Sequence, residues 1–308
     1  MNTTQSVVLS PTMKEYYEKK LLENLKPKLC FVEHGQKKPI PKGNGKTVEF
    51  RKWGSLALAT TPLTEGVPPT AKDLAMTSIK ATVEQFGDVI ETTDVLELTA
   101  YDDVIGGATE VLGDQAGETL DVVARNKLLN TPNEYNAGGR IDADAITQTD
   151  VLKGEDILKI KTIFKRSNVK PFDKHYLMFV SPEQMADIER DPLWIDVNKY
   201  NAAEKIYNGE VGKFRGFRFI DTTLVEPVEN ESGVNVYTGI AIGKNAYGIV
   251  DIAGGSKPKM FVKVPNDNDN DRGDPLNQKS TIGWKALFTA KVLYELAIMR
   301  VQSAATPV

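Results

Sequence analysis

The sequence predicts an α+β protein with extended arms, because helical and strand patterns both occur along the chain. Apolar residues repeat at helical spacing over residues 101–129, where they predict one long helix. Two alternating runs within residues 36–92 flank a segment rich in Pro and Gly, which predicts a long two-stranded excursion. Residues 176–255 combine a capped helix with short strands, as a compact α+β subdomain would.

The composition is that of a globular protein, with 41% apolar and 26% charged residues among 308. A net charge of −4 argues against a surface that wraps and reads nucleic acid, which would be basic. Cys30 is the only cysteine, which rules out an intrachain disulfide framework and fits a reducing compartment. Residues 1–30 lack the apolar core of a signal peptide, and no window approaches the roughly 18 apolar residues of a membrane span. We therefore expect a soluble protein made inside the cell.

The first residues predict a polar arm. Residues 1–12 are rich in Ser, Thr, Asn and Gln, and residues 13–25 have the spacing of a short amphipathic helix that Pro27 ends. Because this arm is too polar to fold by itself, we expect it to lie on the body of the protein or on a neighbour.

Residues 36–92 predict a hairpin that needs a partner. Alternation around Val48 and Phe50 predicts one strand, and alternation resumes at Ile79. The segment between them contains Trp53, Leu56, Leu58 and Leu63 without a helical or sustained strand repeat. An isolated two-stranded hairpin is only marginally stable in water, and exposed apolar side chains call for a covering surface. We expect that surface to belong to another copy of the chain.

The stretch at 101–129 predicts a spine helix roughly 43 Å long. Thr99 or Thr93 is expected to cap it, and Asn130 with Pro132 to end it. Glycines within it either kink the helix or let another backbone approach closely; an ordinary core helix is the alternative interpretation. The expected buried face is Tyr101, Val104, Ile105, Ala108, Val111, Leu112, Ala116, Leu120 and Val123, and the expected solvated face is Asp102, Asp103, Glu110, Asp114, Glu118, Asp121 and Arg125.

The rest of the chain predicts helices and strands in mixed order. We expect a helix over 151–164, a second helix from Ser181 with Pro182 at its first position, and a closing strand pair at 284–293 and 298–301, although the last region also fits a helix. Further strands are expected at 176–180, 217–220, 236–242, 247–252 and 259–264.

No motif predicts catalysis, so no catalytic residue, cofactor or metal ligand is assigned. Gly45-Lys46-Thr47 resembles the end of a phosphate-binding loop, but that motif needs Gly where Ile40 stands, and a helix where a strand follows. Residues 267–274 have part of the spacing of a calcium loop; a solvated acidic loop is the alternative. His34 and His175 have no companion cysteines for zinc, and no nucleophile elbow occurs. Cys30 is expected to be a small packed residue.

Several stretches resemble the coat proteins of tailed phages, with the N4-type major capsid family as the nearest group. They are Ile40-Pro41-Lys42, Gly45 to Arg51, Trp53, Leu56 to Val67, Asp274 to Gln278, Ile282 to Ala286 and Ala290-Lys291. The resemblance implies the Hong Kong 97 capsid fold. It places an N-terminal arm at 1–35, an E-loop hairpin at 36–92, a P-domain holding the spine helix at 93–170 and 256–308, and an A-domain at 171–255.

The function that this resemblance implies is a major capsid protein, which self-assembles into hexamers and pentamers of an icosahedral shell around packaged DNA. The expected assembly residues are Lys46, Arg51, Trp53, Leu56, Leu58, Leu63 and Glu65. Expected partners are further copies, a portal, and scaffold or decoration proteins, with the DNA enclosed without sequence-specific binding and no membrane contact. The expected location is the virion capsid, assembled in the bacterial cytoplasm. No covalent crosslink is predicted, and any scaffold is expected to be separate or cleaved.

Three other classes remain open at the level of sequence. An encapsulin-like compartment would use the same fold to hold a cargo enzyme. A carboxylate- or metal-dependent hydrolase would be active as a monomer, and a tail protein would form rings or tubes.

Overall fold

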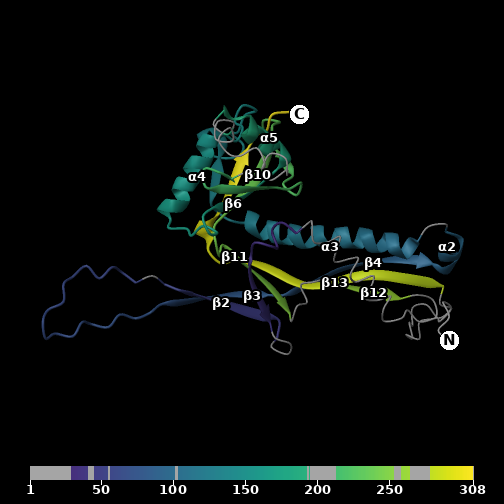
Figure 1. Ribbon diagram of the computed structural model, residues 1–308, viewed down its shortest axis with the longest axis horizontal. Helices are drawn as coiled ribbons and strands as arrows, with labels where there is room; N and C mark the ends of the chain where they lie inside the picture. The colour runs from purple at the N-terminus through teal and green to yellow at the C-terminus, as the bar shows by residue number, and fades with distance from the viewer. Residues whose placement is uncertain are drawn as a thin grey trace.

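The computed structural model describes residues 29–40, 45–54, 56–100, 103–192, 194, 213–252, 258–263 and 278–307. The expected helix at 13–25, the acidic loop at 267–274, and Tyr101 and Asp102 lie outside the described residues. Two layers and one projection make up the described structure (Figure 1). A lower layer contains a long sheet and the longest helix, an upper unit contains a second sheet with two helices, and a hairpin projects sideways from the lower layer.

The long sheet is built around β13, a strand of 14 residues. Its antiparallel neighbours are β4, β11 and β12, and β1 adds to β11 in parallel. The bounds are β1 (Gln36–Ile40), β4 (Glu84–Thr93), β11 (Tyr247–Ile252), β12 (Lys259–Lys263) and β13 (Lys279–Val292). Thus β1 and β4, which both lie in the range expected for the E-loop, pair with the long sheet, and the division of the chain into domains stays a prediction.

The predicted spine helix is present as α3 (Val104–Leu129), which lies along one face of the long sheet (Figure 1). Asn130 ends it as predicted, but its N-cap is Asp103, whose Oδ1 accepts a hydrogen bond from Gly106 N at 2.9 Å. The prediction of Thr99 or Thr93 as this cap was wrong, because Thr93 caps a separate short helix, α2 (Asp94–Thr99).

The buried face of α3 differs from the predicted one at two positions. Val111 was expected to be buried and is exposed, whereas Asp121 was expected to be solvated and is fully buried. The small residues Gly113, Ala116, Gly117 and others line the buried side. On the neighbouring sheet, the Trp284 indole reaches the helix and donates a hydrogen bond to Gln115 Oε1 at 3.0 Å.

The upper unit is a seven-stranded sheet with α4 (Gly154–Arg166) and α5 (Pro182–Arg190). Ser181 and Gln184 form the predicted capping box of α5, each side chain bonding to the other residue's backbone N–H. The strands are β5 (Glu134–Asn136), β6 (Tyr176–Val180), β7 (Lys213–Phe214), β8 (Phe217–Asp221), β9 (Pro227–Glu229), β10 (Asn235–Ile242) and β14 (Ile298–Ser303); two short 3-10 helices are η2 (Ala137–Gly139) and η4 (Glu295–Ala297).

The strands predicted after residue 175 are all present within a few residues of their expected bounds. The expected closing strand pair was wrong in one respect: β13 lies in the long sheet and β14 in the upper sheet, so they do not pair with each other. Two short crossings, 243–246 and 293–297, connect the layers and hydrogen-bond to each other. Gly243 N donates to Ala297 O at 2.8 Å, and Leu293 N donates to Ala246 O at 2.9 Å.

Within the described part of the chain, no helix is both long and apolar enough to cross a membrane. The same residues contain no group of three or more His, Cys, Asp or Glu side chains that could hold a metal ion.

Candidate assembly surface

The projecting hairpin consists of β2 (Thr47–Trp53), β3 (Met76–Thr82) and the loop 54–75 between them. The two strands pair antiparallel from Thr47 opposite Thr82 to Trp53 opposite Met76. Gly54 N extends the ladder by donating to Ala75 O at 2.8 Å, and the described loop residues beyond it, 56–75, form no strand. Figure 1 shows the loop reaching well away from the rest of the subunit.

One face of the hairpin base is anchored to the long sheet. Val48, Phe50 and Ala81 are buried in a small apolar cluster with Ile40, Val83 and Val250. Gly248 makes this contact possible, because a Cβ at that position would lie 2.5 Å from the Phe50 ring. The hairpin is therefore held at its base by ordinary core packing.

The opposite face of the base carries polar residues. Glu49 and Lys80 form an exposed ion pair at 3.5 Å, and Arg51 lies on the same face as Glu49. On the anchored side, the Lys52 ammonium lies 4.1 Å from the centre of the Tyr294 ring, a cation–π contact with the body. Lys46 is exposed at the start of β2, and its carbonyl accepts a hydrogen bond from Val83 N at 2.9 Å.

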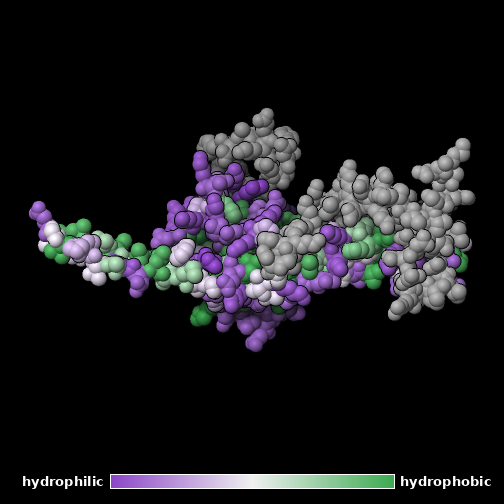
Figure 2. Space-filling view, turned by 90° about the horizontal axis from the view of Figure 1, so that it is seen from below, coloured by the Kyte–Doolittle hydropathy of each residue, from purple (hydrophilic) through white to green (hydrophobic). Residues whose placement is uncertain are grey.

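The end of the hairpin and its loop expose apolar side chains without cover. Leu58 is 86% exposed, Leu63 76% and Trp53 59%. Leu56, Val67, Leu74 and Met76 add to this set. In Figure 2, hydrophobic side chains, shown in green, follow the projecting arm along its length. Contiguous exposed apolar surface of this kind marks an interaction site.

The loop turns at Glu65 and Gly66. Gly66 has φ +74°, a conformation that glycine adopts without strain, and Val67 N donates to Thr64 O at 3.2 Å. Every described loop residue is exposed. Since the loop lacks contacts of its own that would bury these side chains, the single subunit leaves this surface open.

Six of the seven predicted assembly residues therefore lie on the hairpin, Lys46 directly precedes it, and all seven are exposed in the subunit. Whether they contact a neighbour stays a prediction. The sequence reasoning missed Leu74 and Met76; the cross-strand pairing of Met76 with Trp53 could have identified the latter. It also missed the exposed Ile141 and Val228 of the upper unit, which no periodic pattern indicates.

Cys30 is the only cysteine of the chain, and its environment does not activate its thiol. Burial raises the pKa of the Cys30 thiol to about 11, and the nearby Asp121 carboxylate adds to this shift. A thiol with a raised pKa is a poor nucleophile, which agrees with the packing role predicted for it.

Comparisons with known proteins bear on this arrangement. The model of a family described as phage capsid protein matches residues 76–301. No curated protein matches the chain.

Several solved structures have a similar fold. The capsid of Ralstonia phage GP4 aligns with a TM-score of 0.68 at 13% identity, covering 89% of this chain and 87% of that one. The capsid of the cyanophage P-SCSP1u aligns with a TM-score of 0.66 at 14% identity, over 90% and 89% of the two chains. A virus-like particle from Pyrococcus furiosus aligns with a TM-score of 0.55 at 10% identity, over 93% and 98%.

Proposed function

The chain belongs to the phage capsid protein family and has the Hong Kong 97 capsid fold, and we propose that its copies tile the icosahedral head shell as hexamers and pentamers. It is a structural protein, the major capsid protein of the virion. The shell encloses the packaged genome, which it contacts without reading sequence. Assignment to the N4-type group within the family remains part of this proposal.

The observation that carries the proposal is the hairpin with its uncovered apolar loop. A hairpin anchored only at its base leaves Trp53, Leu58 and Leu63 in water, where burial would be favourable by about 25 cal/mol for each Å² covered. A neighbouring copy supplies that cover at every position of the shell. Each copy both gives a hairpin and receives one, as in any head-to-tail interface.

The seven residues of the proposed contact divide by chemistry. Trp53, Leu56, Leu58 and Leu63 supply the apolar centre, and Trp is among the residues that dominate interface energy. Lys46, Arg51 and Glu65 lie at its edges, where charges set orientation and exclude wrong docking more than they add affinity.

We also propose boundaries for the domains of the subunit. The arm is assigned to 1–35, the E-loop to 36–92, the P-domain to 93–170 and 256–308, and the A-domain to 171–255. The pairing of β1 and β4 with the long sheet supports a narrower free hairpin, confined to 45–83, within the E-loop range.

Other partners follow from the proposed role. A head needs a portal through which DNA enters, and scaffold or decoration proteins fit the same assembly. The shell is proposed to assemble in the bacterial cytoplasm. Measured DNA binding by purified subunits that weakens steeply with salt would count against a passive inner wall.

The test is Trp53→Asp in the full chain, with Thr60→Asp as the matched control. Both substitutions place one charge on the exposed part of the hairpin, but only the first removes apolar surface. We expect Trp53→Asp to leave a folded subunit that forms no shells, and Thr60→Asp to form shells. Electron microscopy and sedimentation measure the particles, and circular dichroism measures the fold. Normal particles from Trp53→Asp would show that this loop does not hold neighbouring subunits together.

An encapsulin-like compartment is the second candidate. Its support is the likeness to the virus-like particle from Pyrococcus furiosus, which spans nearly all of both chains. The two functions are distinguished by contents: purified particles from infected cells hold nucleic acid in the first case and a co-purifying cargo enzyme in the second.

A further inference from the structure

The upper unit is polarised in charge along its central strand. β10 runs from Asn235, opposite Glu229 of β9, to Ile242, opposite Leu177 of β6. Eight residues of strand separate these two ends by roughly 24 Å. Cations gather at the Ile242 end and carboxylates at the Asn235 end.

The basic end combines three segments of the chain. The Lys161 side chain of α4 passes over Gly216, where a Cβ would lie 2.9 Å from Lys161 Nζ. Tyr176 N donates to Gly216 O at 2.9 Å, which fixes the β7–β8 turn against the start of β6. Lys244 N donates to Lys170 O at 2.8 Å, which adds the crossing after β10. The cations of this end are Lys161, Lys165, Arg166, Lys170, Lys174, Lys213, Arg215, Arg218 and Lys244.

Among the described residues, none of these cations has an ion-pair partner. Lys213 and Arg218 are direct cross-strand neighbours, and like charges in that position destabilise a sheet. The pKa of His175 is lowered by its burial and then by Lys213, Lys174 and Lys161, which agrees with a positive field here.

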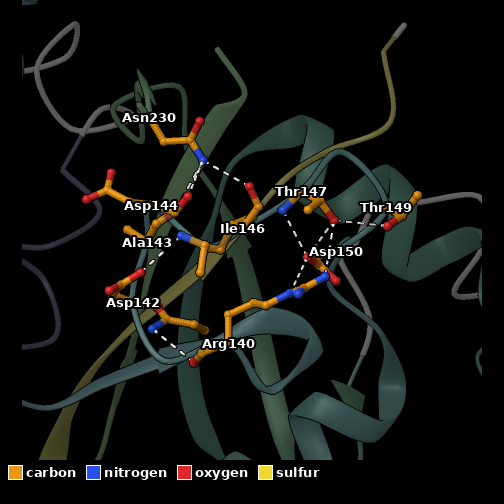
Figure 3. Close-up of polar contacts among 11 residues, drawn as sticks. Arg140, Asp142, Ala143, Asp144, Ile146, Thr147, Thr149, Asp150 and Asn230 are labelled. Atoms are coloured by element: carbon orange, nitrogen blue, oxygen red, sulfur yellow. Dashed lines mark hydrogen bonds and ion pairs between the residues drawn. The ribbon is translucent and has the colours of Figure 1, made fainter. Parts of the chain in front are cut away.

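The acidic end is held in shape by Asn230 (Figure 3). Its Nδ2 donates to Ile146 O at 2.9 Å and to Ala143 O at 3.3 Å, which ties the loop 140–150 to the β9–β10 turn. Arg140 is the nearby cation, and its Nε already binds Asp150 at 2.7 Å. Five exposed carboxylates without an ion pair among the described residues remain at this end: Asp142, Asp144, Glu226, Glu229 and Glu231.

Apolar surface accompanies the carboxylates. Ile141 is 92% exposed beside Asp142, and Val228 is exposed beside Glu229. A charged rim around exposed apolar side chains is the usual composition of a protein–protein contact.

We propose that the basic end of one copy binds the acidic end of the next, so that the upper units form a head-to-tail contact. The inference rests on the proposed shell function and deepens it, since two different faces of one subunit that complement each other close into rings when the rotation allows. Opposite potentials on the two ends steer the approach and fix which faces meet. This contact is separate from the hairpin, which lies in the lower layer (Figure 1).

The experiment is a charge swap in the full chain. One variant carries Lys161→Glu and Lys213→Glu, a second carries Asp144→Lys and Glu229→Lys, and a third carries all four changes. We expect each double variant to need an about tenfold higher concentration for assembly, and the fourfold variant to recover most of that loss. Assembly of the native chain is expected to weaken with salt.

A control variant distinguishes loss of this contact from an effect of the changed net charge alone. Lys259→Glu with Lys285→Glu makes the same change of net charge as Lys161→Glu with Lys213→Glu, but on the long sheet, away from both ends of the upper unit. We expect it to assemble like the native chain, with all variants checked for fold by circular dichroism.

Three results would overturn the contact. If both double variants assemble normally while Trp53→Asp still blocks assembly, the ends do not meet, and the shell function stands. If the fourfold variant does not recover and the native chain binds a 30-base-pair duplex through Lys161 and Lys213, the basic end binds a polyanion instead. If the native chain forms no shells at all, the proposed function fails together with this contact.

Discussion

Asp121 is a carboxylate in the core that sequence periodicity assigns to solvent. Its side chain accepts backbone hydrogen bonds from Cys30 N at 2.6 Å, Phe31 N at 3.1 Å and Val32 N at 3.0 Å. These bonds fasten the segment before β1 to the spine helix, and the Tyr247 hydroxyl adds a bond to Phe31 O. Burial raises the pKa of Asp121 to about 6, although the three N–H donors act in the opposite direction.

This raised pKa gives a residue-scale prediction for Asp121→Asn. A group whose pKa rises on folding stabilises the native state below its ordinary value of 3.8, and that contribution is lost as the pH rises through about 6. We expect the stability advantage of the native chain over Asp121→Asn to shrink by up to about 3 kcal/mol between pH 4 and pH 7. Denaturant titrations of the unassembled full chain at several pH values measure it.

Asp114→Asn is the comparison on the same helix, because it makes the same change from carboxylate to amide at a side chain that is only partly buried. The effect specific to the buried carboxylate is the difference between the two variants at each pH. If the difference in free energy of unfolding between the native chain and Asp121→Asn does not change with pH, the pKa of Asp121 does not change on folding.

At the scale of elements, the fit of the hairpin base on the long sheet depends on Gly248. We expect Gly248→Ala to displace the Phe50 ring and destabilise the protein, because the added Cβ overlaps it. Phe50→Ala should cost about 3–5 kcal/mol by itself. The double variant should lose less stability than the sum of the two single losses, by about 1 kcal/mol or more, because removing the ring relieves the overlap.

Gly107→Ala is the control for this cycle. A Cβ there meets nothing within 4 Å, and alanine favours a helix interior, so stability should rise by up to about 1 kcal/mol. Additive effects at positions 50 and 248 would show that the two do not contact each other in solution.

The sequence predicted the positions of helices and strands more accurately than it predicted which strands pair with each other. Helical spacing located α3, and alternation located β2 and β3, because each pattern reports which face of one element is buried. It could not show that β13 and β14 belong to different sheets, since pairing depends on residues far away in the chain. Asp121 was misplaced for the same reason, because its partners are 89–91 residues distant.

The exposure of the candidate assembly residues was predicted for a related reason, while their contact with a neighbour stays a prediction. Trp53, Leu58 and Leu63 lie in a segment without any repeat that would bury them, so their exposure follows from local sequence. The charged ends of the upper unit were not predicted, because Lys161, Lys174 and Lys213 are brought together by the fold alone.

At the scale of the whole molecule, we expect the loop 54–75 to contribute to assembly and not to the stability of the subunit. We expect replacement of residues 55–74 by an Asn-Gly turn to leave the free energy of unfolding within about 0.5 kcal/mol, because the described loop residues are exposed. The same variant should form no shells. A loss of several degrees in Tm on thermal unfolding would instead place the loop on its own subunit's body.

Three short segments, 130–133, 243–246 and 293–297, carry the chain between the layers, and the layers share one apolar core. Because no strand belongs to both sheets, a small tilt between the layers would shift side chains of that core and leave every strand register intact. Copies repeated over a closed surface could then differ in local curvature through the angle between the layers, while their sheets keep the same pairing.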